Sequence, residues 1–147
     1  MCIEVRKTCC CGKHNVQFHL RDNIMSSEVI LSLYCPNCSP DIPVHDEAMV
    51  CDKNWIIEYD MELAQFLAAA RLNLAPDVVD PAFLFDAGYA TWLELYPGEK
   101  EDILAERKDI MELAKTDPRK YLETINSWNI SRVERLKADG WRKAQAT

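Results

Sequence analysis

The stretch "KTCCCGKHN", residues 7–15, places three consecutive cysteines directly before a glycine. A second stretch, "CPNC" at 35–38, places two cysteines around a proline and an asparagine. The apolar segment "VILSLY" at 29–34 runs straight into that second stretch. Short cysteine spacings of this kind belong in tight turns, so the two stretches decide how the N-terminal part of the chain folds.

Alternating apolar and polar residues predict strands on both sides of the first cysteine stretch. Ile3 and Val5 share one face of the segment 2–7, and "VQFHL" at 16–20 alternates in the same way. With the Cys/Gly turn between them, these segments predict a β-hairpin. Two further strands and a proline-rich loop are expected after it, at 29–34, 54–59 and 39–43.

From Asp60 onward the apolar residues take helical spacing. Asp60 is a suitable N-cap for the helix that follows it. The apolar face expected for this helix consists of Leu63, Phe66, Leu67 and Ala70. A change from alternating to helical spacing at this point predicts a boundary between a unit at 1–59 and a second unit at 60–147.

The next predicted helix begins at Asp80-Pro81, where an N-cap precedes a proline in the first helical position. Helical spacing is expected to continue to about Tyr96, before Pro97-Gly98 interrupts the chain. Four aromatic residues of this segment would then form a stripe of their own, Phe85, Tyr89, Trp92 and Tyr96. The stripe is interpreted as part of a buried central helix, with a groove for a partner as the alternative.

Three further helix signals complete the helical region. Residues 99–115 carry an apolar stripe with helical spacing, and Asp117-Pro118 restarts a helix after it. Ser131 and Glu134 have the spacing of a capping box, and Gly140 stands where a helix would end. The predicted fold class is therefore α+β, a small antiparallel β unit followed by an all-helical region of about five helices.

The formal net charge of −7 is unevenly distributed. Residues 59–118 hold thirteen acidic and five basic residues, whereas residues 119–147 hold three acidic and seven basic ones. An acidic middle argues against a nucleic-acid surface over the whole domain. The basic tail keeps a local one open, and its candidate contacts are Arg132, Arg135, Lys137, Arg142 and Lys143.

Apolar runs in the sequence fall well short of the roughly 20 residues that cross a bilayer. The N-terminal "MCIEVRKTCCC" carries charges from residue 4 onward and lacks the apolar stretch of a secretion signal. We therefore expect a cytoplasmic protein that makes no membrane contact.

The distribution of cysteine and histidine is the strongest functional signal. The seven cysteines and three histidines all lie within the first 51 residues. They are Cys2, Cys9, Cys10, Cys11, Cys35, Cys38 and Cys51, with His14, His19 and His45. An odd cysteine count without an export signal disfavours a disulfide framework and favours metal binding.

Two cysteine turns about 24 residues apart can face each other and form a tetrahedral thiolate site. In the first turn Gly12 follows Cys11, and in the second Pro36 stiffens the segment between Cys35 and Cys38. This arrangement resembles a zinc ribbon, a rubredoxin-like metal-binding module, over residues 3–59 or so. The resemblance implies a metal site whose ligands are Cys9, Cys11, Cys35 and Cys38.

The first turn departs from the usual C-x-x-C-G pattern of that module, because Thr8 stands three residues before Cys11. A C-x-C-G spacing remains, in which Cys10 lies between the two ligands. Alternatively Cys10 competes with Cys11, or Cys51 or His14 supplies the fourth ligand. Cys2 is interpreted as an apolar strand residue. At position 39 a serine stands where the module usually has glycine.

Zinc is the expected metal, because it is the commonest occupant of a closed four-thiolate site, with iron as the alternative. A unit of about 55 residues buries little apolar surface, so a structural ion would contribute much of its stability. We recognise no H-E-x-x-H, G-x-S-x-G or phosphate-binding glycine motif. The first hypothesis is therefore a non-enzymatic zinc ribbon fused to a helical domain that binds another protein.

Two other hypotheses remain open. One is a redox or metal-dependent activity at the cysteine cluster, in which Cys10 and Cys51 take part. The other is nucleic-acid binding through the ribbon and the basic C-terminal helix. The sequence predicts neither the biological process nor the oligomeric state.

Overall fold

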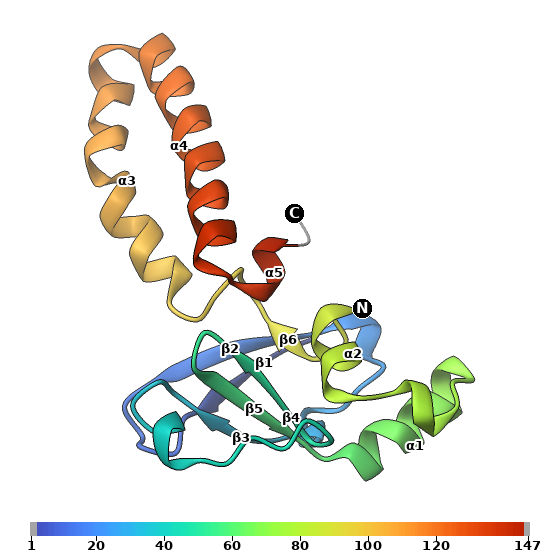
Figure 1. Cartoon of the computed structure of the whole chain (residues 1–147). Coiled ribbons are helices and arrows are strands. Elements are labelled where there is room, and N and C mark those ends of the chain that lie inside the picture. Colours follow the sequence, from blue (N-terminus) through green and yellow to red (C-terminus); the bar gives the residue numbers. More distant parts are fainter. Residues whose placement is uncertain (1–2, 146–147) are drawn as a thin grey trace. The chain divides into compact units, whose positions relative to one another are not determined.

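A computed structural model describes residues 3–145, and the contacts divide the chain into two compact units, Met1–Leu93 and Glu94–Thr147 (Figure 1). The elements of the first unit are β1 (Ile3–Thr8), β2 (Asn15–Leu20), β3 (Ile30–Tyr34), β4 (Met49–Asp52), β5 (Trp55–Tyr59), α1 (Met61–Leu72), α2 (Pro81–Asp86) and β6 (Thr91–Trp92). Those of the second unit are α3 (Glu99–Thr116), α4 (Pro118–Asp139) and α5 (Arg142–Gln145). The predicted α+β class is confirmed.

Both α1 and α2 belong to the first unit, together with the strands. The boundary expected between residues 59 and 60 marks the change from strand to helix inside this unit. Whether residues 1–59 fold independently of α1 and α2 stays a prediction. None of the helices within residues 3–145 combines the length and apolar character that a membrane crossing requires.

The first sheet has the strand order β1-β2-β6. Its β1 and β2 form the predicted antiparallel hairpin, in register from Ile3 opposite Leu20 to Thr8 opposite Asn15. Apolar alternation explains the pairing, since Val16, Phe18 and Leu20 all point into the core from β2. The hairpin register leaves Cys9 as the first residue beyond the last pair, at the start of the connecting turn.

The second sheet has the order β3-β5-β4, with both pairs antiparallel. The strands predicted at 29–34 and 54–59 are confirmed as β3 and β5, whereas β4 was not expected from the sequence. Lys53 and Asn54 join β4 to β5, and both have left-handed backbone angles, φ 51° and φ 70°. Such a pair forms the two-residue turn that suits a hairpin, here without the glycine that usually signals it.

One hydrophobic core lies within the first unit, and both sheets contribute to it. Trp92 is at its centre, with ring centroids 5.3 Å from Phe18, 5.7 Å from Phe85 and 6.0 Å from Trp55. The indole Nε1 of Trp92 donates a hydrogen bond of 2.8 Å to the buried carboxylate of Asp52. This bond fastens β6 of the first sheet to β4 of the second.

The helix expected from Asp80 to about Tyr96 is much shorter in the structure, because α2 ends at Asp86. Asp80 caps it as predicted, accepting from Phe83 N at 2.7 Å. Gly88 then takes φ +84°, a conformation that terminates helices, and Thr91–Trp92 pairs with β2 instead. The prediction of an aromatic stripe along one helix was therefore wrong.

The apolar face of α1 is also rotated from the predicted one. Asp60 caps the helix as expected, accepting from Leu63 N at 3.1 Å. The buried residues are Ala64, Leu67 and Ala68, while Phe66 is 67% exposed. Ala64 and Ala68 face the core and Phe66 faces away from it, so helical spacing placed the apolar face on partly the wrong side of the helix.

The second unit is an antiparallel helical hairpin formed by α3 and α4 (Figure 1). Asp117 separates the two helices and caps α4, accepting from Lys120 N at 3.1 Å. The capping box at Ser131 does not start a new helix, because α4 runs without interruption to Asp139 and ends at Gly140 as expected. The fully buried positions among this unit's described residues are only three, Glu99, Leu136 and Ala144.

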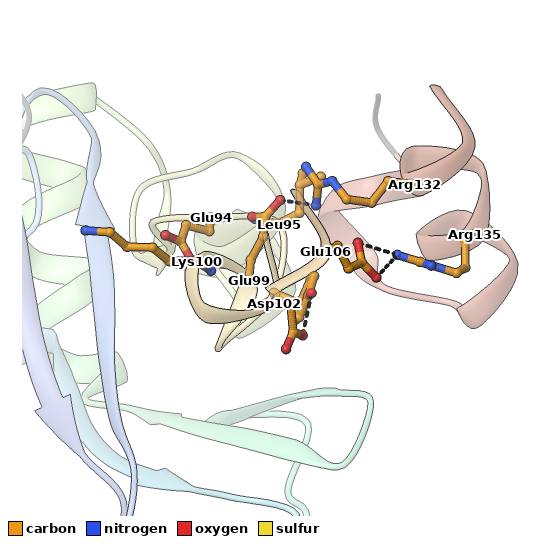
Figure 2. Close-up of polar contacts among 9 residues, drawn as sticks. Glu94, Leu95, Glu99, Lys100, Asp102, Glu106, Arg132 and Arg135 are labelled. Atoms are coloured by element: carbon orange, nitrogen blue, oxygen red, sulfur yellow. Dashed lines mark hydrogen bonds and ion pairs between the residues drawn. The ribbon is translucent and has the colours of Figure 1, made fainter. Parts of the chain in front are cut away.

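Polar contacts therefore hold much of the second unit together (Figure 2). The buried Glu99 carboxylate forms an ion pair with Arg132 and accepts a 2.7 Å hydrogen bond from Leu95 N. Glu106 forms a further ion pair with Arg135 at 2.8 Å. Each of these ion pairs bridges α3 and α4. Charged groups therefore stabilise this interface, whereas apolar packing stabilises the first unit.

We predict that Trp92→Phe destabilises the first unit by at least about 2 kcal/mol, the scale of a hydrogen bond to a charged group. The substitution keeps an aromatic ring but removes the donor that reaches Asp52. Chemical denaturation of the two proteins measures the effect. Trp141→Phe is the matched control, because the stacking of Trp141 on Tyr96 does not need the indole nitrogen. Equal and small losses of unfolding free energy in both variants would contradict the placement of Trp92.

Candidate metal centre

The first cysteine turn connects β1 to β2. Cys9 N donates to His14 O at 2.9 Å, and Gly12 N donates to Cys9 O at 2.9 Å, so two backbone bonds close the turn. Gly12 has φ +76°, which a residue with a side chain rarely adopts. The glycine of "CCCGK" therefore allows the chain to turn after Cys11, and the turn holds the cysteines at one end of the hairpin.

The second cysteine turn directly follows β3. The carbonyl oxygen of Cys35 accepts two hydrogen bonds of 2.9 Å, from Cys38 N and from Ser39 N. Ser39 opens a short 3₁₀ helix and is not in the left-handed region. Its side-chain hydroxyl also donates to Pro36 O at 3.3 Å. Because the turn needs no positive φ at this position, serine can stand where glycine was expected.

A backbone hydrogen bond joins the two turns. Cys10 N donates to Leu33 O at 3.1 Å, which ties the middle of the first turn to β3 just before Cys35. No signal in the sequence indicated this contact, since it links residues far apart in the chain. It holds the turns together through main-chain atoms, independently of any side chain.

The sulfur atoms of the two turns lie close together. The Sγ atoms of Cys9 and Cys11 are 3.0 Å apart, and Cys11 Sγ lies 3.6 Å from Cys35 Sγ across a separation of 24 residues. Cys38 Sγ lies 3.6 Å from Cys35 Sγ. Within residues 3–145, Cys9, Cys11 and Cys35 form the group whose ligand atoms all lie within 4.8 Å of one another.

These distances suit a thiolate-bound ion. Zinc–sulfur bonds of about 2.3 Å in a tetrahedron place neighbouring sulfurs about 3.8 Å apart. Two of the observed separations are close to that edge, at 3.6 Å, and the third is shorter, at 3.0 Å. Cys9, Cys11, Cys35 and Cys38 are therefore positioned to bind a metal ion.

Contacts among the thiols shift their acidities in opposite directions. Burial raises the pKa of Cys9, but hydrogen bonds from the Cys11 thiol and from backbone groups outweigh it and lower that pKa to about 6. The same contact with Cys9 raises the pKa of Cys11 to about 12. Hydrogen bonding to Cys10, then burial, raises the pKa of Cys38 to about 11. Without metal, the cluster thus holds one thiolate beside thiols that keep their protons. A bound cation would displace those remaining protons.

The alternative ligands lie elsewhere. The His14 ring packs edge-on against Trp55, with centroids 5.8 Å apart. Cys51 lies on β4 opposite Ile56 and is exposed. It faces a cavity of about 350 Å³ that also includes Pro36 and Ser39 of the second turn. Cys2, expected to be an apolar strand residue, falls outside the residues that the structure describes. His14 and Cys51 therefore do not join the sulfur group.

The basic tail has fewer side chains available for nucleic-acid contacts than its sequence indicated. Arg132 is nearly buried in its ion pair with Glu99, and Arg135 is paired with Glu106 (Figure 2). The Arg132 guanidinium also lies over the ring of Trp128, at 5.4 Å from its centroid. Two of the five residues considered for nucleic-acid contacts are thus used inside the second unit.

Comparison of the chain with protein families, with curated proteins and with solved structures found no significant match. The case for the metal centre therefore rests on the positions of the cysteines and on the turns that hold them.

We predict that one thiol of the metal-free protein ionises with a midpoint near pH 6, observed as thiolate absorbance in the ultraviolet. An unfolded cysteine keeps its proton until about pH 8.5, so ionisation of Cys9 stabilises the folded state fully above that pH. This contribution disappears as the pH falls through 6. Cys9→Ser should abolish the early ionisation, and Cys51→Ser should retain it. Absorbance that rises only in the ordinary cysteine range would contradict the cluster.

Proposed function

We propose that the protein binds one structural zinc ion through the thiolates of Cys9, Cys11, Cys35 and Cys38. The observation that carries this proposal is the convergence of sulfurs from two turns, with Cys11 and Cys35 only 3.6 Å apart although 24 residues separate them. Backbone hydrogen bonds close each turn, and another ties the first turn to the strand that leads into the second. A preformed, all-sulfur group of this kind is typical of the metal centre in zinc-ribbon modules.

Zinc is favoured by the donor set. Thiolate ligands select zinc or iron over the hard cations, and zinc is the commoner occupant of closed four-thiolate sites. When bound, the ion supplies a cross-link between the β1–β2 turn and the end of β3. Four protein ligands leave no open position for a substrate, so the role proposed for the ion is structural rather than catalytic.

We further propose that the second unit binds another protein. Its described residues include three buried positions, Glu99, Leu136 and Ala144, although the unit contains two long helices. Four large apolar side chains are instead exposed, namely Leu104 at 68%, Met111 at 46%, Leu122 at 59% and Ile130 at 66%. Exposed apolar surface on a small helical hairpin supports a binding role. Nucleic-acid binding has weaker support, because Arg132 and Arg135 are already paired with carboxylates.

The protein purified without chelator should contain one zinc ion per chain by elemental analysis. Serine substitution at Cys9, Cys11, Cys35 or Cys38 removes one ligand and should reduce the zinc content strongly. Cys10→Ser and Cys51→Ser are the matched controls, and both should keep a full equivalent of zinc. Iron in place of zinc would change the metal but not the site. No bound metal in repeated preparations, or zinc loss in a control variant alone, would contradict the proposed ligands.

The double substitution Leu104→Gln/Leu122→Gln should abolish binding of a partner while leaving the zinc content and helical circular dichroism unchanged. Both side chains are exposed, so their replacement costs little folding stability. Affinity purification from the native cells, with the wild type and the double variant as baits, measures the effect through the proteins that each one retains. If the wild type and the double variant retain the same proteins, Leu104 and Leu122 are not part of a binding surface.

A further inference from the structure

The exposed apolar side chains of the second unit lie at two heights along the α3–α4 hairpin. Asp117 separates the helices, so in this antiparallel pair residues equally distant from it along the chain lie at about the same height. Leu104 and Ile130 are both 13 residues from Asp117. Met111 is six residues before it, and Leu122 is five residues after it. The four residues therefore form two apolar layers, Leu104 with Ile130 and Met111 with Leu122.

The four side chains also lie on one side of the hairpin. Each residue of an α-helix is rotated about 100° from the one before it. Leu104 and Met111 each follow by one position a half-buried isoleucine of α3, and Leu122 follows the half-buried Tyr121 of α4. Because the helices run antiparallel, the same rotation along each chain points to the same side of the pair. Ile130 is two i+4 steps beyond Leu122, on the same helical row. The Tyr121 hydroxyl lies 3.6 Å from Met111 Sδ, which agrees with the height assigned to the second layer.

A second copy of the chain presents the matching surface. A two-fold axis parallel to the helices turns one hairpin onto the other, so that α3 of each copy faces α4 of the other copy. Rotation about this axis preserves height, so Leu104 meets Ile130 of the second copy and Met111 meets Leu122 of the second copy. Each contact then occurs twice, which is the property of an isologous interface. The result is a four-helix bundle in which neighbouring helices are antiparallel.

The charge of the second unit favours its own copy as the occupant of this face. Residues 94–147 hold eleven acidic and eleven basic residues, whereas residues 1–93 hold thirteen acidic and six basic ones. The net charge of −7 therefore belongs to the first unit, and the second unit is neutral. A strongly charged partner of either sign would gain no net attraction from a neutral unit, whereas two copies that meet through it face no net repulsion there.

The face is also large enough for a dimer. The 18 residues of α3 and the 22 residues of α4 give helices about 27 and 33 Å long. With helices about 10 Å wide, the flat outline of the face is about 540 Å². Stable interfaces bury about 800 Å² of accessible surface on each partner. Accessible area follows the side chains and exceeds the flat outline, so the face approaches what a stable dimer requires.

We propose that the second unit joins two copies of this chain into a four-helix bundle through these two apolar layers. This inference rests on the protein-binding role proposed above for the second unit, and it names the partner. The bundle buries Leu104, Met111, Leu122 and Ile130 of both copies. It thereby supplies an apolar core to a hairpin whose described residues include only three buried positions.

Sedimentation equilibrium of the purified 16.9 kDa chain over a range of micromolar concentrations should show a species of twice that mass. A reductant is present throughout, because Cys10 and Cys51 are exposed and could cross-link two copies. Leu104→Glu and Ile130→Lys each place a charge in the first layer. Each should weaken dimerisation at least tenfold, since burial of an unpaired charge is costly. Phe66→Glu is the matched control in the first unit, where Phe66 is 67% exposed, and it should leave the dimer unchanged.

A mixture of the two charged variants tests the pairing itself. In the mixed dimer the introduced carboxylate faces the introduced ammonium in one contact, and Leu104 faces Ile130 in the other. The equimolar mixture of Leu104→Glu and Ile130→Lys should therefore recover most of the affinity that each variant lost. A mixture no more dimeric than the single variants would overturn the proposed pairing.

The wild type alone decides whether the second copy is the partner, even if a variant fails to fold. A mass of one chain at every concentration would overturn the proposal. The protein-binding role fails by a different result, namely a monomer that also retains no other protein in purification from the native cells. A monomer that does retain another protein would refute only the second copy as the partner.

Discussion

Two cysteine turns separated by 24 residues must meet, and the rest of the first unit is arranged around that constraint. The hairpin register of β1 and β2 places one turn, and the end of β3 places the other. A main-chain hydrogen bond from Cys10 N to Leu33 O ties the first turn to β3, the strand that leads into the second. The backbone thereby brings the sulfurs together, and a bound cation would offset the repulsion between thiolates that this proximity creates.

The two units are stabilised by different interactions. In the first, Trp92 and its aromatic neighbours belong to a hydrophobic core shared by two sheets, and the cysteine turns lie at the ends of these strands. In the second, ion pairs such as Glu99–Arg132 connect α3 to α4, and large apolar side chains remain exposed. Large apolar side chains such as Leu31 and Phe66 are exposed in the first unit as well. The two proposed roles therefore rest on separate observations, the cysteine cluster in the first unit and the few buried positions of the helical hairpin in the second.

Local patterns in the sequence predicted the elements that depend on local chemistry. Apolar alternation identified β1 and β2, apolar segments identified β3 and β5, and aspartate caps located the starts of three helices. Tertiary pairing decided what was missed. Thr91–Trp92 lies in a strand because β2 offers it an unpaired edge, and β4 is joined to β5 by a turn without glycine. Spacing and the resemblance to a zinc ribbon singled out the cysteines that the structure brings together, but not the hydrogen bond from Cys10 N to Leu33 O, which depends on how the first turn meets β3.

X-ray absorption at the zinc edge of the native protein tests the central claim most directly. Four sulfur neighbours at about 2.3 Å are the expected result, because the site is proposed to consist of cysteine thiolates alone. Serine at position 10 should leave that spectrum unchanged, and serine at position 38 should replace or remove one sulfur neighbour. Nitrogen or oxygen neighbours in the native protein, or fewer than four sulfurs, would contradict the account.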